Sequence, residues 1–120
     1  MTLEKLAAQQ AHAAELHEPL TVPELQELAR TQAIQHNIDP DVFLAVAQCE
    51  SGFNAKIRSQ NMLPSGKQEN SWGVFQINLD AHDVAWKDAV NPYYNIEWAA
   101  THWTDPAHDW KICYAKARYN

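Results

Sequence analysis

The sequence contains no apolar run that approaches the roughly 18–20 residues needed to cross a membrane. Its first twenty residues show neither the apolar centre nor the cleavage site of a secretory signal peptide, so we expect none on this chain. Basic residues are few and scattered, with nine Lys and Arg against fifteen Asp and Glu, for a net charge of −6. This balance argues against nucleic acid and acidic membrane surfaces as partners.

Metal-binding patterns are also missing. The six histidines form no His-Glu-x-x-His motif and no paired spacing with cysteine, so we expect neither a metal nor a cofactor. The two cysteines, Cys49 and Cys113, allow one disulfide bond at most. A cysteine nucleophile with His82 or His102 as its base is disfavoured. Cys49 ends a predicted helix, where the helix dipole opposes a thiolate.

Capping signals predict two helices in the first half of the sequence. A weak helical pattern predicts an N-terminal helical extension over residues 1–20, ahead of one domain over residues 21–120. A Thr-x-x-Glu capping box at residues 21–24 starts the first strongly patterned helix. Asp-Pro at residues 39–40 starts the second, which ends near Ser51 because a glycine follows.

The remaining sequence predicts more helix and little β structure. Residues 53–72 show no periodicity and are interpreted as a long loop or small hairpin, a kind of segment that is usually functional. Asn-Pro at residues 91–92 and Asp-Pro at 105–106 predict two further helices, the first running to about Trp103. We therefore expect a mainly α (α+β) fold with at most one small β-hairpin.

Glu50 lies in the last turn of a predicted apolar helix. Phe43, Val46 and Ala47 precede it by seven, four and three residues and share its helix face, so its carboxyl group should point into the protein or a cleft. Desolvation and the negative end of the helix dipole would both raise its pKa. A carboxyl group that stays protonated near neutral pH suits general acid catalysis on a glycosidic bond. A glutamate turned to solvent is the alternative.

Three short motifs follow one another in the sequence. They are Glu50-Ser51, Gly-Val-Phe-Gln at residues 73–76, and Ala-Arg-Tyr-Asn at residues 117–120, with "NPYYNI" between the last two. This order resembles the soluble lytic transglycosylases of the lysozyme-like superfamily over residues 38–120. The resemblance implies a lysozyme-like fold and, as substrate, peptidoglycan strands of N-acetylmuramic acid and N-acetylglucosamine. It also implies a monomer that works outside the cytoplasm.

The resemblance implies roles for individual residues. Glu50 is similar to a single catalytic acid that later acts as a base. Tyr119 is similar to a tyrosine whose hydroxyl orients that carboxyl group, with Asn120 in support. Ser59 is similar to a serine that contacts the sugar or orients the acid, and Gln76 is similar to a glutamine that binds an N-acetyl sugar. Asn120 is also expected to bind the substrate.

A hydrolase normally needs a second carboxylate across the cleft. In lysozymes with a similar Gly-x-x-Gln-Ile-Asn turn this carboxylate lies two residues before the glycine, where this sequence has Ser71, which we expect to line the substrate groove. With one acid, the chemistry would be internal: Glu50 would protonate the bond and then deprotonate the sugar's 6-hydroxyl to close a 1,6-anhydro ring. A muramidase that uses Glu69, and a catalytically weak peptidoglycan-binding domain, are the alternatives.

The cysteines carry a second resemblance. Cys49 directly precedes the acid, and Trp110 precedes Cys113 by three residues, which is similar to resuscitation-promoting-factor domains. The two cysteines pair in those domains, so the resemblance implies a Cys49–Cys113 disulfide and an oxidising compartment. Such a bond would contribute on the order of 4 kcal/mol by chain entropy. Two free thiols are the alternative.

Overall fold

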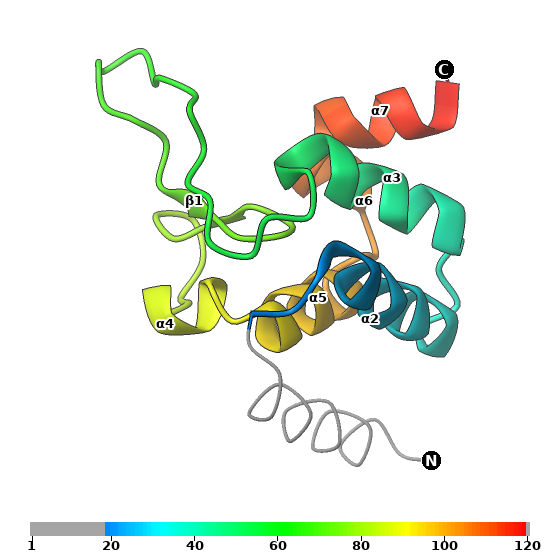
Figure 1. Ribbon diagram of the computed structural model, residues 1–120. Coiled ribbons are helices and arrows are strands. Elements are labelled where there is room, and N and C mark those ends of the chain that lie inside the picture. Colours follow the sequence, from blue (N-terminus) through cyan, green and yellow to red (C-terminus); the bar gives the residue numbers. More distant parts are fainter. Residues whose placement is uncertain (1–18, 120) are drawn as a thin grey trace.

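The computed structural model describes residues 19–119, so all but the last two residues of the expected N-terminal extension over residues 1–20 lie outside the described part (Figure 1). Helices predominate in the described part, and a two-stranded antiparallel sheet joins β1 to β2. The expected mainly α fold is therefore confirmed. The elements are α2 (Val22–Gln35), α3 (Pro40–Ser51), β1 (Ser71–Trp72), β2 (Ile77–Asn78), α4 (Trp86–Ala89), α5 (Pro92–Thr101), α6 (Pro106–Asp109) and α7 (Lys111–Tyr119).

The ends of α2 and α3 follow the predicted capping signals. The Thr21 hydroxyl accepts a hydrogen bond from the backbone N–H of Glu24, whose carboxylate accepts one from the Thr21 N–H at 2.8 Å. At the start of α3, the Asp39 carboxylate accepts from the Asp41 N–H at 3.0 Å. Gly52 ends α3 with a φ of 64°, a left-handed conformation that favours glycine.

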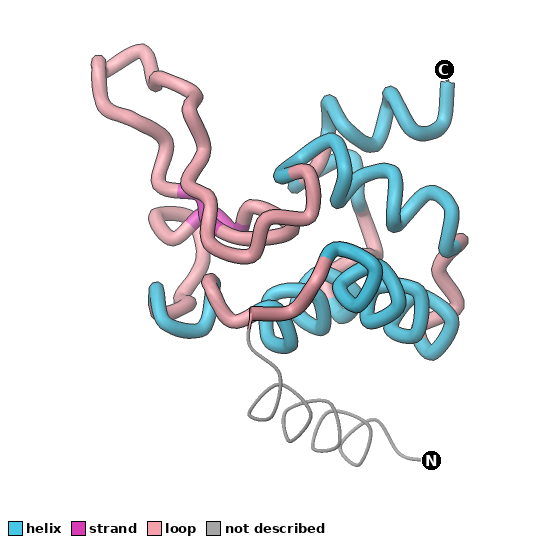
Figure 2. Tube along the Cα trace, in the orientation of Figure 1, coloured by secondary structure: helices cyan, strands magenta, loops and turns pink. Residues whose placement is uncertain are grey.

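The segment between α3 and β1 is a loop, as the missing periodicity predicted (Figure 2). Two isolated bridges, Arg58 with Trp72 and Met62 with Gln68, draw it into a narrow arm that projects from the helices. It returns into β1, which pairs with β2 so that Ser71 lies opposite Asn78. The four residues between these strands, 73–76, form a tight turn, named here the 73–76 turn.

Two helix predictions need correction. The helix that begins at Pro92 ends at Thr101, two residues before the predicted end. The final predicted helix is two helices, because Trp110 leaves helical geometry with φ −123° and ψ 39°. Its indole N–H donates to the carbonyl oxygen of Phe75 at 2.8 Å, so the break coincides with a contact to a distant part of the chain. Helix α4 was not predicted from the sequence, because no side-chain cap marks its start.

The core lies where α2, α3 and α5 meet the 73–76 turn. Phe43 of α3 and Phe75 of the turn are both fully buried, with ring centroids 4.4 Å apart. Trp110 adds its ring edge-on to Phe75 and is 2% exposed. Burial of these large side chains therefore couples the turn to the helices. No helix within residues 19–119 is long and apolar enough to span a bilayer.

Candidate active site

Glu50 occupies the last turn of α3 and is partly buried. Phe43, Val46 and Ala47, on the same helix face, are fully buried, as predicted. Burial raises the pKa of the Glu50 carboxyl group from 4.5 to about 7, and the negative charge of Glu69 adds to the rise. The predicted direction is confirmed. The charge of this loop carboxylate was not predicted from the sequence, and the expected effect of the helix dipole is not among the causes found.

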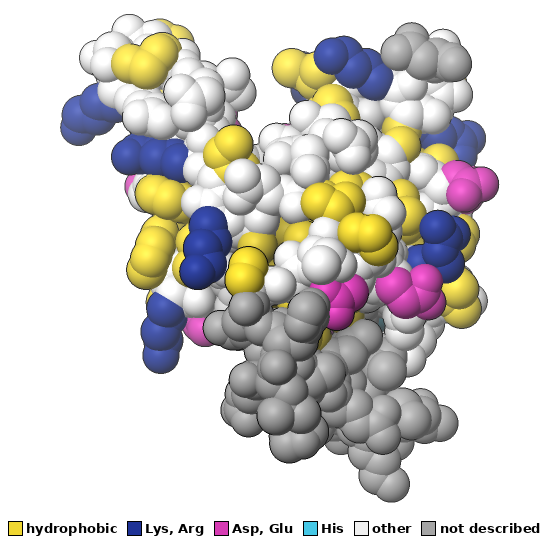
Figure 3. Space-filling model, viewed as in Figure 1, with side chains coloured by type: hydrophobic (Ala, Val, Ile, Leu, Met, Phe, Trp, Pro, Cys, Tyr) yellow, Lys and Arg dark blue, Asp and Glu magenta, His cyan; other side chains and the backbone are white. Residues whose placement is uncertain are grey.

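The surface is hollowed beside the end of α3. Figure 3 shows a notch between the tip of the loop and α7, and in the same view of Figure 1 the C-terminal end of α3 lies at its foot. Glu69 comes from the returning half of the loop, close enough for its charge to act on Glu50. Because Glu50 is only partly buried, its side chain is shielded from water without being sealed from the surface.

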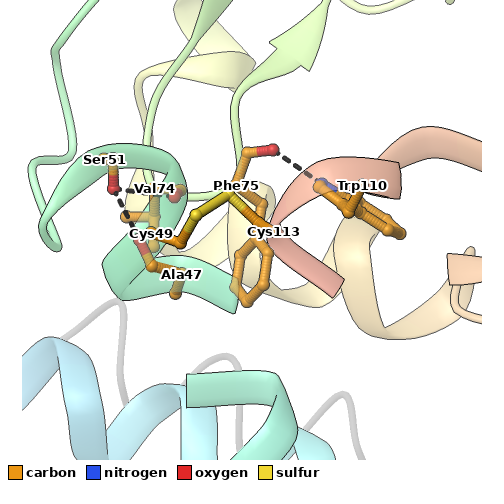
Figure 4. The surroundings of a disulfide bond; sticks show 7 residues. All are labelled: Ala47, Cys49, Ser51, Val74, Phe75, Trp110 and Cys113. Carbon is orange, nitrogen blue, oxygen red and sulfur yellow. Dashed lines mark hydrogen bonds between the residues drawn. A yellow bond between two sulfur atoms is a disulfide. The ribbon is translucent and has the colours of Figure 1, made fainter. Parts of the chain in front are cut away.

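Ser51 ties the end of α3 to the 73–76 turn. Its hydroxyl donates to the carbonyl oxygen of Val74 at 2.7 Å and lies 3.3 Å from that of Ala47 (Figure 4). The same hydroxyl accepts from the Asn54 N–H at 3.3 Å. The residue after the acid thus joins three backbone segments, which restricts how Glu50 can move.

Asn95 of α5 holds the turn from the opposite side. Its side chain is fully buried; its carbonyl oxygen accepts from the Phe75 N–H at 2.8 Å, and its amide donates to the carbonyls of Trp72 at 3.1 Å and Ala89 at 2.8 Å. Gly73 passes so close that a Cβ there would collide with Ala89 and Asn95. This role of Asn95 was not predicted from the sequence, although a polar residue on an apolar helix face indicates a buried hydrogen-bonding side chain.

A disulfide bond joins Cys49 to Cys113 and confirms the pairing that the second resemblance implied. It links α3, one residue before the candidate acid, to α7 (Figure 4). On the same side of the turn, the Trp110 indole binds the Phe75 carbonyl oxygen. The candidate acid is therefore embedded in a framework in which helices, turn and disulfide hold one another.

Three of the four residues expected to bind the substrate, Ser59, Ser71 and Gln76, lie in or next to the strands and the turn. The Ser59 N–H donates a hydrogen bond to the carbonyl oxygen of Ser71 at 2.9 Å, and the Ser59 hydroxyl accepts one from the Asn61 N–H. Ser71 is 1% exposed, which favours a structural role. Gln76, with a φ of 52°, uses its amide N–H₂ on the carbonyls of Gly73 and Ile57, at 2.9 and 3.0 Å. Their contacts with a sugar stay predictions.

The structure does not bring Tyr119 to Glu50. In Figure 1, α7 leads away from the C-terminal end of α3 toward the C-terminus. Tyr119 lies six residues beyond Cys113, about 9 Å farther along the helix, and its side chain is 81% exposed. Its hydroxyl binds no other described residue, and the expected supporting residue Asn120 lies outside the described part.

Histidine and carboxylate side chains gather at one other place. The Asp109 Oδ1 atom lies 3.3 Å from Nε2 of His82, which follows β2 in the sequence, and 3.4 Å from Nδ1 of His108. Within residues 19–119, no group of three or more His, Cys, Asp or Glu side chains could hold a metal ion.

Comparison with known proteins agrees with this framework. Neither a search of curated proteins nor one of solved structures gives a match. The family described as "Transglycosylase SLT domain" matches residues 27–105, about two thirds of the chain. The matched segment contains Glu50, Ser51, the 73–76 turn and Asn95. The chain therefore belongs to the transglycosylase SLT domain family.

Proposed function

We propose that this protein cleaves peptidoglycan glycan strands as a lytic transglycosylase and that Glu50 is its single acid and base. Family membership supports a transglycosylase-type action on peptidoglycan, outside the cytoplasm. The observation that supports Glu50 most directly is its burial in the last turn of α3, which raises its pKa to about 7. At pH 7 about half of such groups are protonated, against roughly 0.3% at the ordinary pKa.

The reaction needs only one carboxyl group. Protonated Glu50 donates its proton to the oxygen that joins C1 of N-acetylmuramic acid to O4 of N-acetylglucosamine, and the C1–O4 bond breaks. The acetamido oxygen of the muramic acid stabilises the cation at C1. Glu50, now a carboxylate, removes the proton from the 6-hydroxyl, whose oxygen bonds to C1 and closes the 1,6-anhydro ring. Glu50 is protonated again, and no water is consumed.

The surroundings of Glu50 fit this double role. A pKa near the working pH lets one group give and then take a proton at comparable cost. The bonds of Ser51 and Asn95 hold the helix end and the turn in one arrangement, which favours a constant position of the acid. Sugar contacts by Ser59 and Gln76 are supported only by the resemblance. Orientation of the acid by Tyr119, which the resemblance also implies, is not part of the proposal, because Tyr119 is 81% exposed and lies away from Glu50.

A muramidase is the second candidate, because the charge of Glu69 acts on Glu50. In that reaction Glu69 would guide a water molecule to C1, and the product would have a free reducing end.

Clearing of purified cell walls tests the proposal. Glu50→Gln should slow the loss of turbidity at least about 100-fold, since it removes the proton donor. Glu69→Gln should keep most of the activity in a transglycosylase and lose it in a muramidase. Sedimentation of Glu50→Gln with the walls controls for binding. If the wild type and Glu50→Gln cleared walls equally fast, the proposed enzymatic role of Glu50 would be refuted. If the wild type sedimented with the walls but did not clear them, the protein would be a binding domain.

A further inference from the structure

A large cavity lies apart from the candidate acid. Its described walls come from the start of α2, from residues 52–56 and from the junction of α4 and α5 at residues 87–93. Its volume is about 1050 Å³, at the upper end of ligand pockets, which hold about 300–1,000 Å³. Glu50 is not among the described residues that line it. Residues 52–56, however, begin two positions after Glu50, so one segment of backbone belongs to both places.

The cavity combines an apolar wall with positive charge. Leu25 and Phe53, each 3% exposed, contribute apolar surface. The charged residues among its described lining are both lysines, Lys56 and Lys87, and both are exposed. Neither forms an ion pair with a residue in the described part of the chain. The chain has a net charge of −6, so the charge of this lining is opposite in sign to that of the protein as a whole.

Such a lining favours a ligand that carries carboxylates next to small apolar groups. Lysines without an ion-pair partner among residues 19–119 can attract an anion without first breaking an ion pair within that part of the chain, and the apolar wall removes hydrocarbon from water. The sugars of a peptidoglycan strand with its peptides attached are uncharged. The free carboxylates are on the peptide stems, beside alanine methyl groups. The stem is also attached to the same muramic acid whose C1 bond the proposed reaction breaks.

We propose that this cavity binds the peptide stem of peptidoglycan, with Lys56 and Lys87 pairing with its carboxylates. The proposal rests on the proposed function in taking peptidoglycan as the substrate. It adds a specificity: strands that carry peptides are preferred to bare glycan.

Calorimetry with the full chain tests binding without any need for catalysis. The probe is the soluble N-acetylated pentapeptide L-Ala–γ-D-Glu–L-Lys–D-Ala–D-Ala. Lys56→Glu/Lys87→Glu should weaken binding about tenfold or more, because attraction becomes repulsion at two positions. Lys111→Glu/Lys116→Glu, which changes the net charge equally on α7, should bind like the wild type. A probe with its carboxylates amidated should bind less well.

Rates on two substrates complete the test. The ratio of the rate on peptide-bearing strands to that on peptide-free strands should fall several-fold in Lys56→Glu/Lys87→Glu and stay unchanged in Lys111→Glu/Lys116→Glu. If the wild type cleaves neither substrate, the proposed function is refuted, but calorimetry still shows whether the cavity binds the peptide. If the wild type binds no pentapeptide, or if Lys56→Glu/Lys87→Glu binds it equally well, the proposal is wrong. The occupant would then be another segment of this chain or a second copy.

Discussion

Glu50 places a carboxyl group where its charged form is unfavourable, so the same feature that suits it to acid catalysis costs stability. Its pKa is about 7 in the folded protein and 4.5 as an ordinary carboxyl group. Between these values the folded state holds more protons than the unfolded state. Stability therefore falls as the pH rises from 4.5 to 7, and the full cost persists above pH 7.

Glu50→Gln should remove this cost. The variant should be more stable than the wild type at pH 8, by at most about 3 kcal/mol, and equally stable at pH 4, where the carboxyl group is protonated in both states. Urea unfolding at the two pH values measures the difference. Glu27→Gln, on the exposed side of α2, is the control and should keep the wild-type pH dependence. Equal stability of Glu50→Gln and wild type at pH 8 would mean that Glu50 is solvated.

The pH dependence of wall clearing should report the same group. The rate should fall as the pH rises through about 7, because the first step needs protonated Glu50. Glu69→Gln should move this fall to lower pH, since removal of a nearby negative charge lowers the pKa of Glu50. A pH–rate profile of each protein checks this. An unchanged midpoint in Glu69→Gln would show that the two carboxyl groups do not interact.

Asn95 makes a further prediction at the scale of one residue. Asn95→Ala removes the side-chain partner of two buried backbone groups, the Phe75 N–H and the Ala89 carbonyl, and one hydrogen bond to the partly buried Trp72 carbonyl. We expect a loss of about 3 kcal/mol in the free energy of unfolding, measured in guanidinium chloride. Asn61→Ala in the exposed loop should cost less than about 0.5 kcal/mol. Similar losses in the two variants would contradict the assigned role.

At the scale of elements, the α3–α7 pair depends on its disulfide. Cys49 and Cys113 are separated by 64 positions in the sequence, and chain entropy for a loop of this size corresponds to about 4 kcal/mol. Cys49→Ser/Cys113→Ser should therefore unfold at a clearly lower guanidinium chloride concentration than the oxidised wild type. The wild type in a reducing agent is the matched control and should follow the double variant. Coincident unfolding of all three would show that the bond does not stabilise the fold.

Elements were predictable from the sequence where their cause is local. The start of α2 follows from its capping box. The end of α3 follows from Gly52, because a right-handed helix cannot continue through a residue with a left-handed φ. The break before α7 was not predictable, because Trp110 leaves helical geometry while its indole binds a carbonyl 35 residues away. A local pattern cannot contain a contact of that range.

The same distinction between local and long-range causes applies to the whole molecule. The sequence predicted that Glu50 shares a helix face with buried apolar residues and that its pKa is raised, since both depend on the pattern of one helix. It did not reveal that Glu69 contributes to that pKa, because the loop brings the two charges together only when folded. It also led us to expect Tyr119 beside the acid, whereas α7 leads away from that end of α3.

Mass spectrometry of the fragments released from purified cell walls tests the central claim most directly. If Glu50 is the only acid and base, the wild type releases fragments that end in 1,6-anhydro-N-acetylmuramic acid, one water lighter than reducing ends, and Glu50→Gln releases none. Reducing ends from the wild type, or anhydro ends from Glu50→Gln, would contradict the account.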